Sequence, residues 1–290
     1  MSQTHPVAAP PAWDAIETQA QRLRQYRPQD GFLDRMLTGA LRSARDDGNP
    51  IRGNQFAAAS REVATHLLHT MAPEEQVRAC GWFVQAKDTP TVTRAQRAAF
   101  VAHGGLTPEY VEKTFGLAAA EFVQPLIESM NELHKRTHFK EETILAEDEA
   151  IRGLAAEIFN AIENLLETAD ECRAEIIREL REHIDQQLLE RLIGEAIDDL
   201  DILSAHTQVE GQEATEIEVT EIGATNIRFQ VQGTVYVTLQ WGSGSDFRNG
   251  DGASMSEEFP FSAKVVTSTA DPSKFEEVVD LNVDTEGWYA

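Results

Sequence analysis

The spacing of the apolar residues changes once along the chain, near Ser204, and this change constrains the fold more than any other feature. Before it, apolar residues recur every three or four positions, which is the spacing of amphipathic α-helices. After it, apolar and polar residues alternate, which is typical of half-buried β-strands. The sequence therefore predicts an α+β protein of two domains, in which an all-α helical bundle precedes a small antiparallel β-sheet or sandwich.

Turn signals divide the helical part into separate segments. Helices are expected over residues 32–41, 56–68, 93–102 and 118–133. The longest apolar stripe runs over residues 151–200, with an expected break near residues 168–170. Residues 80–93 lack helical spacing and are predicted to form a loop.

Five short strands are predicted after residue 204. They cover residues 216–220, 227–231, 235–241, 258–266 and 276–283, with Gly233 expected at a turn. From Ser204 onward there are fifteen acidic residues against four basic ones. Such a surface repels nucleic acid and suits a protein partner or a divalent cation.

The composition along the chain suggests three regions. Residues 1–30 are rich in Pro, Gln and Ala and are predicted to be a mobile N-terminal arm, although residues 13–26 could form a short helix. Residues 31–204 are expected to form the helical bundle domain. Residues 205–290 are expected to form the acidic antiparallel β domain.

The net charge of −24 excludes a general electrostatic grip on DNA or RNA. Any nucleic-acid contact must therefore be local, metal-assisted or made by a partner. No apolar stretch reaches the roughly 18 residues of a membrane span, and the N-terminus lacks the features of a signal peptide. Cys80 and Cys172 lie far apart without metal-ligand spacing, so both are expected to be reduced packing residues of a cytoplasmic protein without membrane contact.

The densest polar cluster in the helical part runs from Asn131 to His138. His134 and His138 are four residues apart, so on a helix they share a face. This is the spacing of the zinc-protease helix, but Lys135 stands where the catalytic Glu would be, and that interpretation fails. A simple two-histidine metal site and a packing or capping role for the histidines both stay open.

A second interpretation is an RNase of the HEPN type, whose motif is Arg followed after four to six residues by His. Three stretches have this spacing, from Arg61 to His66, Arg97 to His103 and Arg178 to His183. With so many arginines, one or two matches are expected by chance. The 131–138 cluster does not fit, because Arg136 lies only two residues before His138.

Other familiar nuclease and ligand motifs are incomplete. None of the six lysines has Asp or Glu two residues before it, as a restriction-type nuclease requires, and Gln85 before Lys87 is the one near match. The loop over residues 241–253 resembles an EF-hand at Asn249 and Asp251, but Phe247 stands at its first ligand position. Turns through Asn249-Gly250 and Asp251-Gly252 explain this loop more simply than a bound cation. No phosphate-binding glycine loop is present, so no cofactor-binding residue is predicted and the cofactor stays unknown.

Several strings, in their order along the chain, resemble the bacterial proteins called predicted pPIWI-associating nucleases. The strings include Gly104-Gly105-Leu106 and Leu133 to His138. The most specific are Thr93-Arg94-Ala95-Gln96-Arg97 and the string over residues 240–261, with Gln240-Trp241-Gly242-Ser243 at its start and Phe259-Pro260-Phe261 at its end. The resemblance covers roughly residues 30–290. It implies a component of a prokaryotic antiviral defence system, because these proteins occur in defence gene neighbourhoods. The helical part is also similar in style to HEPN-like bundles, which are often dimers.

Two functional hypotheses follow, and a toxin–antitoxin role is a weaker third. The first is a nuclease or RNase that acts on locally bound nucleic acid, with arginine help from Arg94 or Arg97. Its predicted catalytic residues are Asn131, His134, Arg136 and His138. The alternative is a non-catalytic sensor or adaptor, whose helical domain forms a homodimer and whose acidic β domain docks a partner protein of the defence system.

Overall fold

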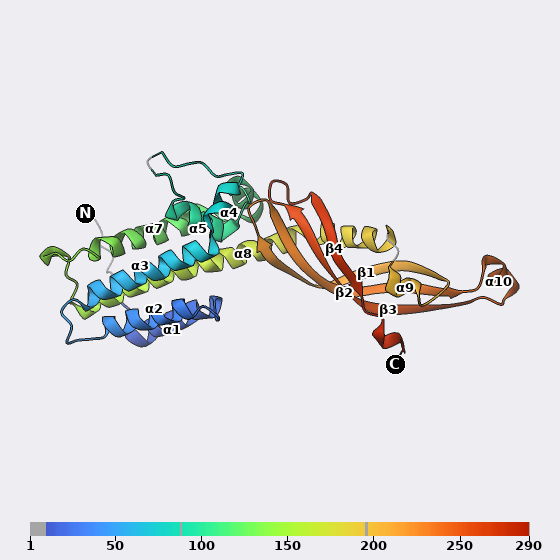
Figure 1. Ribbon diagram of the computed structural model, residues 1–290, viewed down its shortest axis with the longest axis horizontal. Helices are drawn as coiled ribbons and strands as arrows, with labels where there is room; N and C mark the ends of the chain where they lie inside the picture. Colours follow the sequence, from blue (N-terminus) through green and yellow to red (C-terminus); the bar gives the residue numbers. More distant parts are fainter. Residues whose placement is uncertain (1–9, 88, 195–196, 290) are drawn as a thin grey trace, which may run out of the picture. The chain divides into compact units, whose positions relative to one another are not determined.

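The computed structural model describes residues 10–87, 89–194 and 197–289 and divides at Cys172 into two compact units (Figure 1). The helical unit ends at Cys172, and the β unit begins at Arg173. The longest helix, α8 (Asp148–Gly194), contributes its first half to the helical unit and its second half to the β unit. None of the helices in the described part of the chain has both the length and the apolar composition to cross a membrane.

The helical unit contains the four helices expected over residues 32–41, 56–68, 93–102 and 118–133, and the observed ends lie within four residues of the expected ones. In order, the elements are α1 (Trp13–Tyr26), α2 (Gly31–Ala44), α3 (Arg52–Met71), α4 (Glu74–Ala79), α5 (Arg94–His103), α6 (Pro108–Tyr110), a π-helical turn (Val111–Phe115), α7 (Ala119–Arg136), a 3₁₀ turn (Glu141–Thr143) and the first half of α8. Thr93 starts α5 with a capping box, since its hydroxyl accepts from Gln96 N and the Gln96 amide accepts from Thr93 N. Phe56 of α3 meets Phe159 of α8 edge to face in the core.

The first helix packs onto the bundle instead of forming a free arm. Ile16, Ala20 and Leu23 of α1 are almost completely buried. Arg152 of α8 donates hydrogen bonds to the carbonyl oxygens of Pro10 and Pro11. The expectation of a mobile arm therefore does not hold for residues 10–30, because one face of α1 is apolar and finds a partner; residues 1–9 lie outside the described part.

Helix α8 is continuous over Asp148–Gly194, so the break expected near residues 168–170 is wrong. No Gly or Pro lies between residues 154 and 193. Thr168, the residue that suggested the break, is buried, and its hydroxyl donates to Asn164 O within the helix at 2.7 Å. A threonine whose hydroxyl bonds one turn back leaves the helical backbone intact.

The β unit is one antiparallel sheet in the order β1-β2-β3-β4, as Figure 1 shows. The strands are β1 (His206–Ile222), β2 (Asn226–Trp241), β3 (Ala253–Ser268) and β4 (Phe275–Val283), joined by the short helix α10 (Gly244–Asn249) between β2 and β3. The helix α9 (Asp198–Asp201) precedes the sheet, and a 3₁₀ turn (Glu286–Tyr289) follows it. The α+β class with an antiparallel sheet is therefore as predicted.

Two of the predicted strands are one strand, β2, which passes through Gly233 without a turn. A Cβ at Gly233 would lie 2.3 Å from Glu213 O and 2.6 Å from the Phe261 ring. The close neighbours leave no room for a side chain, so this position inside the strand requires glycine. The sequence pattern had instead suggested that Gly233 marks a turn.

The second half of α8 covers one face of the sheet. Its buried stripe is Ile176, Leu180, Ile184, Leu188 and Leu192. The helix contacts both edge strands, because Arg181 donates to Ala214 O in β1 and the His183 ring stacks on Phe275 in β4. The boundary predicted at residue 204 follows the change of secondary structure, whereas the packing divides the chain earlier because the sheet needs this helix to bury its apolar face.

Candidate functional site

The C-terminal end of α7 brings two histidines together. His134 lies in the last turn of the helix, and His138 follows directly after the C-cap residue Thr137. Their ring centroids are 5.1 Å apart with the planes nearly perpendicular, and both side chains are exposed. The four-residue spacing therefore places both imidazoles side by side at the surface.

The other two predicted site residues lie differently. Asn131 is exposed one turn before His134, so both share a face of α7. Arg136 lies two positions from each histidine, which is about 200° around a helix. Its guanidinium pairs with Glu132 at 3.0 Å. The structure thus groups Asn131 with the histidines and places Arg136 on another side of α7.

Glu132 holds two cations at once. Its Oε2 pairs with Lys135 Nζ at 3.0 Å, and its Oε1 pairs with the Arg136 guanidinium at 3.0 Å. The hydrogen bond from Lys135, followed by that from Arg136, keeps the pKa of Glu132 below its ordinary value. The carboxylate is therefore ionised and occupies both cationic side chains.

A polar groove of about 850 Å³ lies between α7 and the first half of α8. Asn131, Glu132 and Lys135 line it from α7. Asn160 and Asn164 line it from α8. The groove offers amide donors and acceptors beside the charged pair, so it is suited to a polar ligand.

Asn54 of α3 anchors the loop that follows α7. It is fully buried, and its Nδ2 donates to Arg136 O at 2.8 Å and to Thr143 O at 2.9 Å, while its Oδ1 accepts from Leu145 N at 3.0 Å. The neighbouring Gly53 donates its N–H to Leu145 O, which a Cβ at residue 53 would approach to 2.4 Å. Sequence reasoning missed Asn54, because a buried asparagine near a helix start has the same local pattern as an exposed one.

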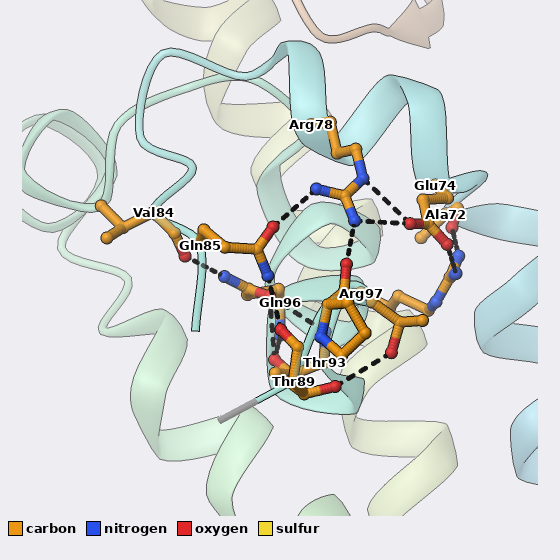
Figure 2. A network of polar contacts seen from close by, with 11 residues as sticks. Ala72, Glu74, Arg78, Val84, Gln85, Thr89, Thr93, Gln96 and Arg97 are labelled. Atoms are coloured by element: carbon orange, nitrogen blue, oxygen red, sulfur yellow. Dashed lines mark hydrogen bonds and ion pairs between the residues drawn. The ribbon is translucent and has the colours of Figure 1, made fainter. Parts of the chain in front are cut away.

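Arg97, which was expected to assist the catalytic cluster, is instead buried in a network of polar contacts between α3, α4 and α5 (Figure 2). It is 5% exposed, donates to the carbonyl oxygen of Ala72 at the end of α3, and pairs with Glu74 at 3.4 Å. The Arg78 guanidinium also binds Glu74, together with Gln85 and the carbonyl oxygen of Pro90. These contacts hold the junction of α3 and α4 and the 80–93 loop, so the role of Arg97 is structural; Arg94 is exposed on α5.

The three histidines with HEPN-type spacing are occupied in packing. His66 pairs with Asp30 at 2.7 Å and contacts the Phe32 ring. The hydrogen bond from Leu33 N, with help from His66, lowers the pKa of Asp30 to about 2. His103 is buried against Trp82, and His183 stacks on Phe275 in the β unit. His103 is buried and His66 is held by Asp30, whereas His183 is exposed but contacts Phe275 and lies in the β unit, away from the two exposed histidines of α7 in the sequence.

The remaining candidate motifs also have structural explanations. Gln85 lies in the 80–93 loop and donates to Thr89 O, and this loop is not the strand that a restriction-type site requires. The described residues contain no group of three or more His, Cys, Asp or Glu side chains that could hold a metal ion. Both cysteines are buried and unbridged, and burial raises the pKa of Cys80 to about 12.

The loop after β2 contains a short helix, α10, instead of a plain hairpin turn. Gly250 has a φ of 84°, so the expected positive-φ residue in the Asn249-Gly250 turn is present. The second expected positive-φ residue, Gly252 in the Asp251-Gly252 turn, does not adopt a positive φ. Asp246 accepts a hydrogen bond from Ser243 N at 2.5 Å and thereby caps this loop.

Two family models match the chain, and both carry the description "Predicted pPIWI-associating nuclease". One matches residues 25–162 and the other matches residues 169–289, so together they cover nearly the whole chain. The chain belongs to this family of predicted nucleases. No curated protein and no solved structure matches it. The change from one family model to the other falls near Cys172, where the structure also divides.

Proposed function

We propose that this protein is an RNA-cleaving nuclease of a prokaryotic antiviral defence system, with His134 and His138 as its catalytic pair. One observation carries the proposal: the two exposed imidazoles have their centroids 5.1 Å apart. The family to which the chain belongs supports a nuclease-related role. Histidine is suited to the chemistry because its charge changes near neutral pH, so a pair can supply one acid and one base.

The reaction would use the ribose 2′-hydroxyl as nucleophile. A neutral imidazole removes the 2′-proton while the 2′-oxygen forms a bond to phosphorus. The protonated imidazole donates its proton to the 5′-oxygen as the P–O5′ bond breaks. The products are a 2′,3′-cyclic phosphate and a free 5′-hydroxyl. Lys135 is exposed and adjacent to His134, so its ammonium group would stabilise the phosphorane charge.

The test is cleavage of labelled RNA and DNA by the full-length protein, with EDTA and with Mg²⁺ or Mn²⁺. We expect cleavage of RNA alone, insensitive to EDTA, with a bell-shaped dependence on pH. His134→Ala and His138→Ala should each lower the rate by about 100-fold or more, as loss of a general acid or base does. His206→Ala is the matched control, because His206 is exposed in the β unit. DNA cleavage, a metal requirement or full activity in both variants would refute the pair.

A non-catalytic adaptor is the second candidate, and the acidic face of the β unit favours it. Exposed glutamates follow the edge strand β1 at Glu213, Glu216, Glu218 and Glu221. Such a row is complementary to a basic protein surface. Under this hypothesis the helical unit would form a homodimer, which light scattering on the pure protein measures.

The docking role is tested with the products of the neighbouring defence genes. Deleting the sheet is unsuitable, because it would expose the apolar stripe of α8 that the sheet covers. Reversing the charge at Glu213, Glu216 and Glu218 leaves the β-strand core untouched. Co-purification that survives this triple Glu→Lys change would remove the docking role.

A further inference from the structure

We infer that the substrate of this site is a single-stranded segment of RNA, held by a phosphate-binding pair, Lys135 and Arg136, and by stacking of a base on Phe139. This inference rests on the proposed function, because it names the substrate of the same site. In the free protein the carboxylate of Glu132 occupies the phosphate position. Glu132 is therefore a built-in competitor of the substrate.

The contacts of Glu132 are those that a phosphate group would make. Each of its two oxygens accepts from a different cation, Lys135 on one side and Arg136 on the other. A phosphodiester also presents two anionic oxygens and binds lysine and arginine in the same way. The side chain of Lys135 is 70% exposed, so it can exchange the carboxylate for a phosphate without a change in the backbone.

Phe139 supplies the second part of the site. It directly follows His138 and is 58% exposed, more than Phe32 at 42% and Tyr236 at 38%, the other exposed aromatic side chains among the described residues. Its loop is nevertheless held in place, since Asn54 bonds Arg136 O before it and Thr143 O after it. An aromatic side chain that a rigid loop holds in water is a stacking platform for an unpaired base.

The charges decide between a single strand and a duplex. The chain carries a net charge of −24, so an extended duplex would meet repulsion over most of its contact surface. Residues 133–140 contain three Lys and Arg side chains and no acidic residue, which suits a few phosphates only. A base in a duplex also has no free face for Phe139, whereas Asn131, Asn160 and Asn164 in the groove can bond the edges of unpaired bases.

The experiment measures binding of a fluorescent, single-stranded 2′-O-methyl RNA to the full-length protein. This probe lacks the nucleophile of the proposed reaction, so binding is read without cleavage. Glu132→Gln should raise the affinity by about three- to tenfold and steepen its salt dependence, because two cations become available to phosphate. The matched control is Glu128→Gln, one turn earlier on α7, whose carboxylate accepts from Gln124 instead of a cation.

The stacking platform is tested with the same probe. Phe139→Ala should lower the affinity by about tenfold, as loss of a stacked base does, while Phe139→Trp should retain it. A duplex of the same sequence should bind more weakly than the single strand. Equal binding of the duplex, equal effects of the two Glu→Gln variants, or no effect of Phe139→Ala would each overturn the inference.

The outcomes separate the inference from the proposed reaction. If the binding pattern holds but RNA is not cleaved, the single-strand site stands and the histidine mechanism fails. If RNA is cleaved but the Glu132 and Phe139 variants bind as the wild type does, the mechanism stands and this substrate site fails. Thermal melting of each variant checks that its fold is unchanged.

Discussion

The helical unit and the β unit bury polar side chains in different ways. In the helical unit, Arg52, Asn54, Arg97 and His103 are buried, and the first three bond backbone carbonyls of distant segments. In the described part of the β unit, the buried polar residues are threonines. The loops of the helical unit thus depend on single polar groups, whereas the β unit depends on strand register and on space for its backbone.

This comparison predicts the largest loss of stability for a buried amide in the helical unit. Asn54→Leu leaves Arg136 O, Thr143 O and Leu145 N without their partner. We expect a loss of about 4 kcal/mol in the free energy of unfolding, since each unsatisfied buried group costs about 1–3 kcal/mol. Hydrogen exchange should show faster exchange around α7 and unchanged protection of the β-strands.

The control for this change is Asn164→Leu, at an exposed position on α8. A surface substitution of this kind should alter stability by no more than about 0.5 kcal/mol. An equal effect of the two variants would show that the polar anchor at Asn54 is unimportant.

In the β unit, the position most sensitive to substitution is one where the backbone has no room for a side chain. A Cβ at Gly233 would lie 2.3 Å from Glu213 O, which belongs to the neighbouring strand and cannot yield cheaply. Gly233→Ala should therefore cost about 3 kcal/mol, at the upper end for overpacking. Gly211→Ala in β1 is the control, because a Cβ there meets nothing within 4 Å. Urea unfolding of both variants that gave equal midpoints would contradict the close contact.

A pH-dependent loss of stability should arise in the helical unit from His103. Its side chain is 1% exposed and lies against Trp82, and this burial lowers its pKa from 6.5 to about 4. The unfolded chain takes up this proton at higher pH than the folded one, so the contribution is complete above pH 6.5 and is lost as the pH falls toward 4.

The size of this effect is measured against a variant without the imidazole. Between pH 7 and pH 5 the wild type should lose about 2 kcal/mol that His103→Leu does not lose, since one pKa unit corresponds to about 1.4 kcal/mol. Asp30 contributes to the pH dependence only at lower pH. Its pKa is lowered from 3.8 to about 2 in the folded protein, so the stability it adds is lost only as the pH falls below 3.8. Parallel pH curves for wild type and variant would rule out His103 as the source.

The smallest effect is expected in the loop after β2. Gly250 has a φ of 84° and open space around it, so Gly250→Ala should cost about 1 kcal/mol through backbone strain alone, and Gly250→Asn should cost less. Gly153→Ala in α8 should instead raise the free energy of unfolding, because alanine favours a helix more than glycine does and a Cβ there meets nothing within 4 Å. Thermal melting that moved both variants in the same direction would contradict this distinction.

Much of the helical unit could be predicted because its signals are local. The positions of α2, α3, α5 and α7 follow from apolar spacing, and Thr93 and Gln96 identify the start of α5 within one turn of the chain. The proximity of His134 and His138 also follows from spacing, since residues four apart on a helix are neighbours. The pairing of Arg136 with Glu132 follows from the same four-residue spacing. Local signals could not reveal that Asn54, more than 80 residues away in the chain, holds the loop beside the histidines.

By itself, the sequence determined the change from helices to strands near Ser204, because apolar spacing reports which side of each element must be buried. Tertiary structure alone decided how these elements are grouped. It assigned the second half of α8 to the sheet, made β2 one strand through Gly233, and enclosed Arg97 and His103. Each of these results depends on contacts between residues distant in the chain, and a local pattern carries no information about which distant group will fill the adjacent space.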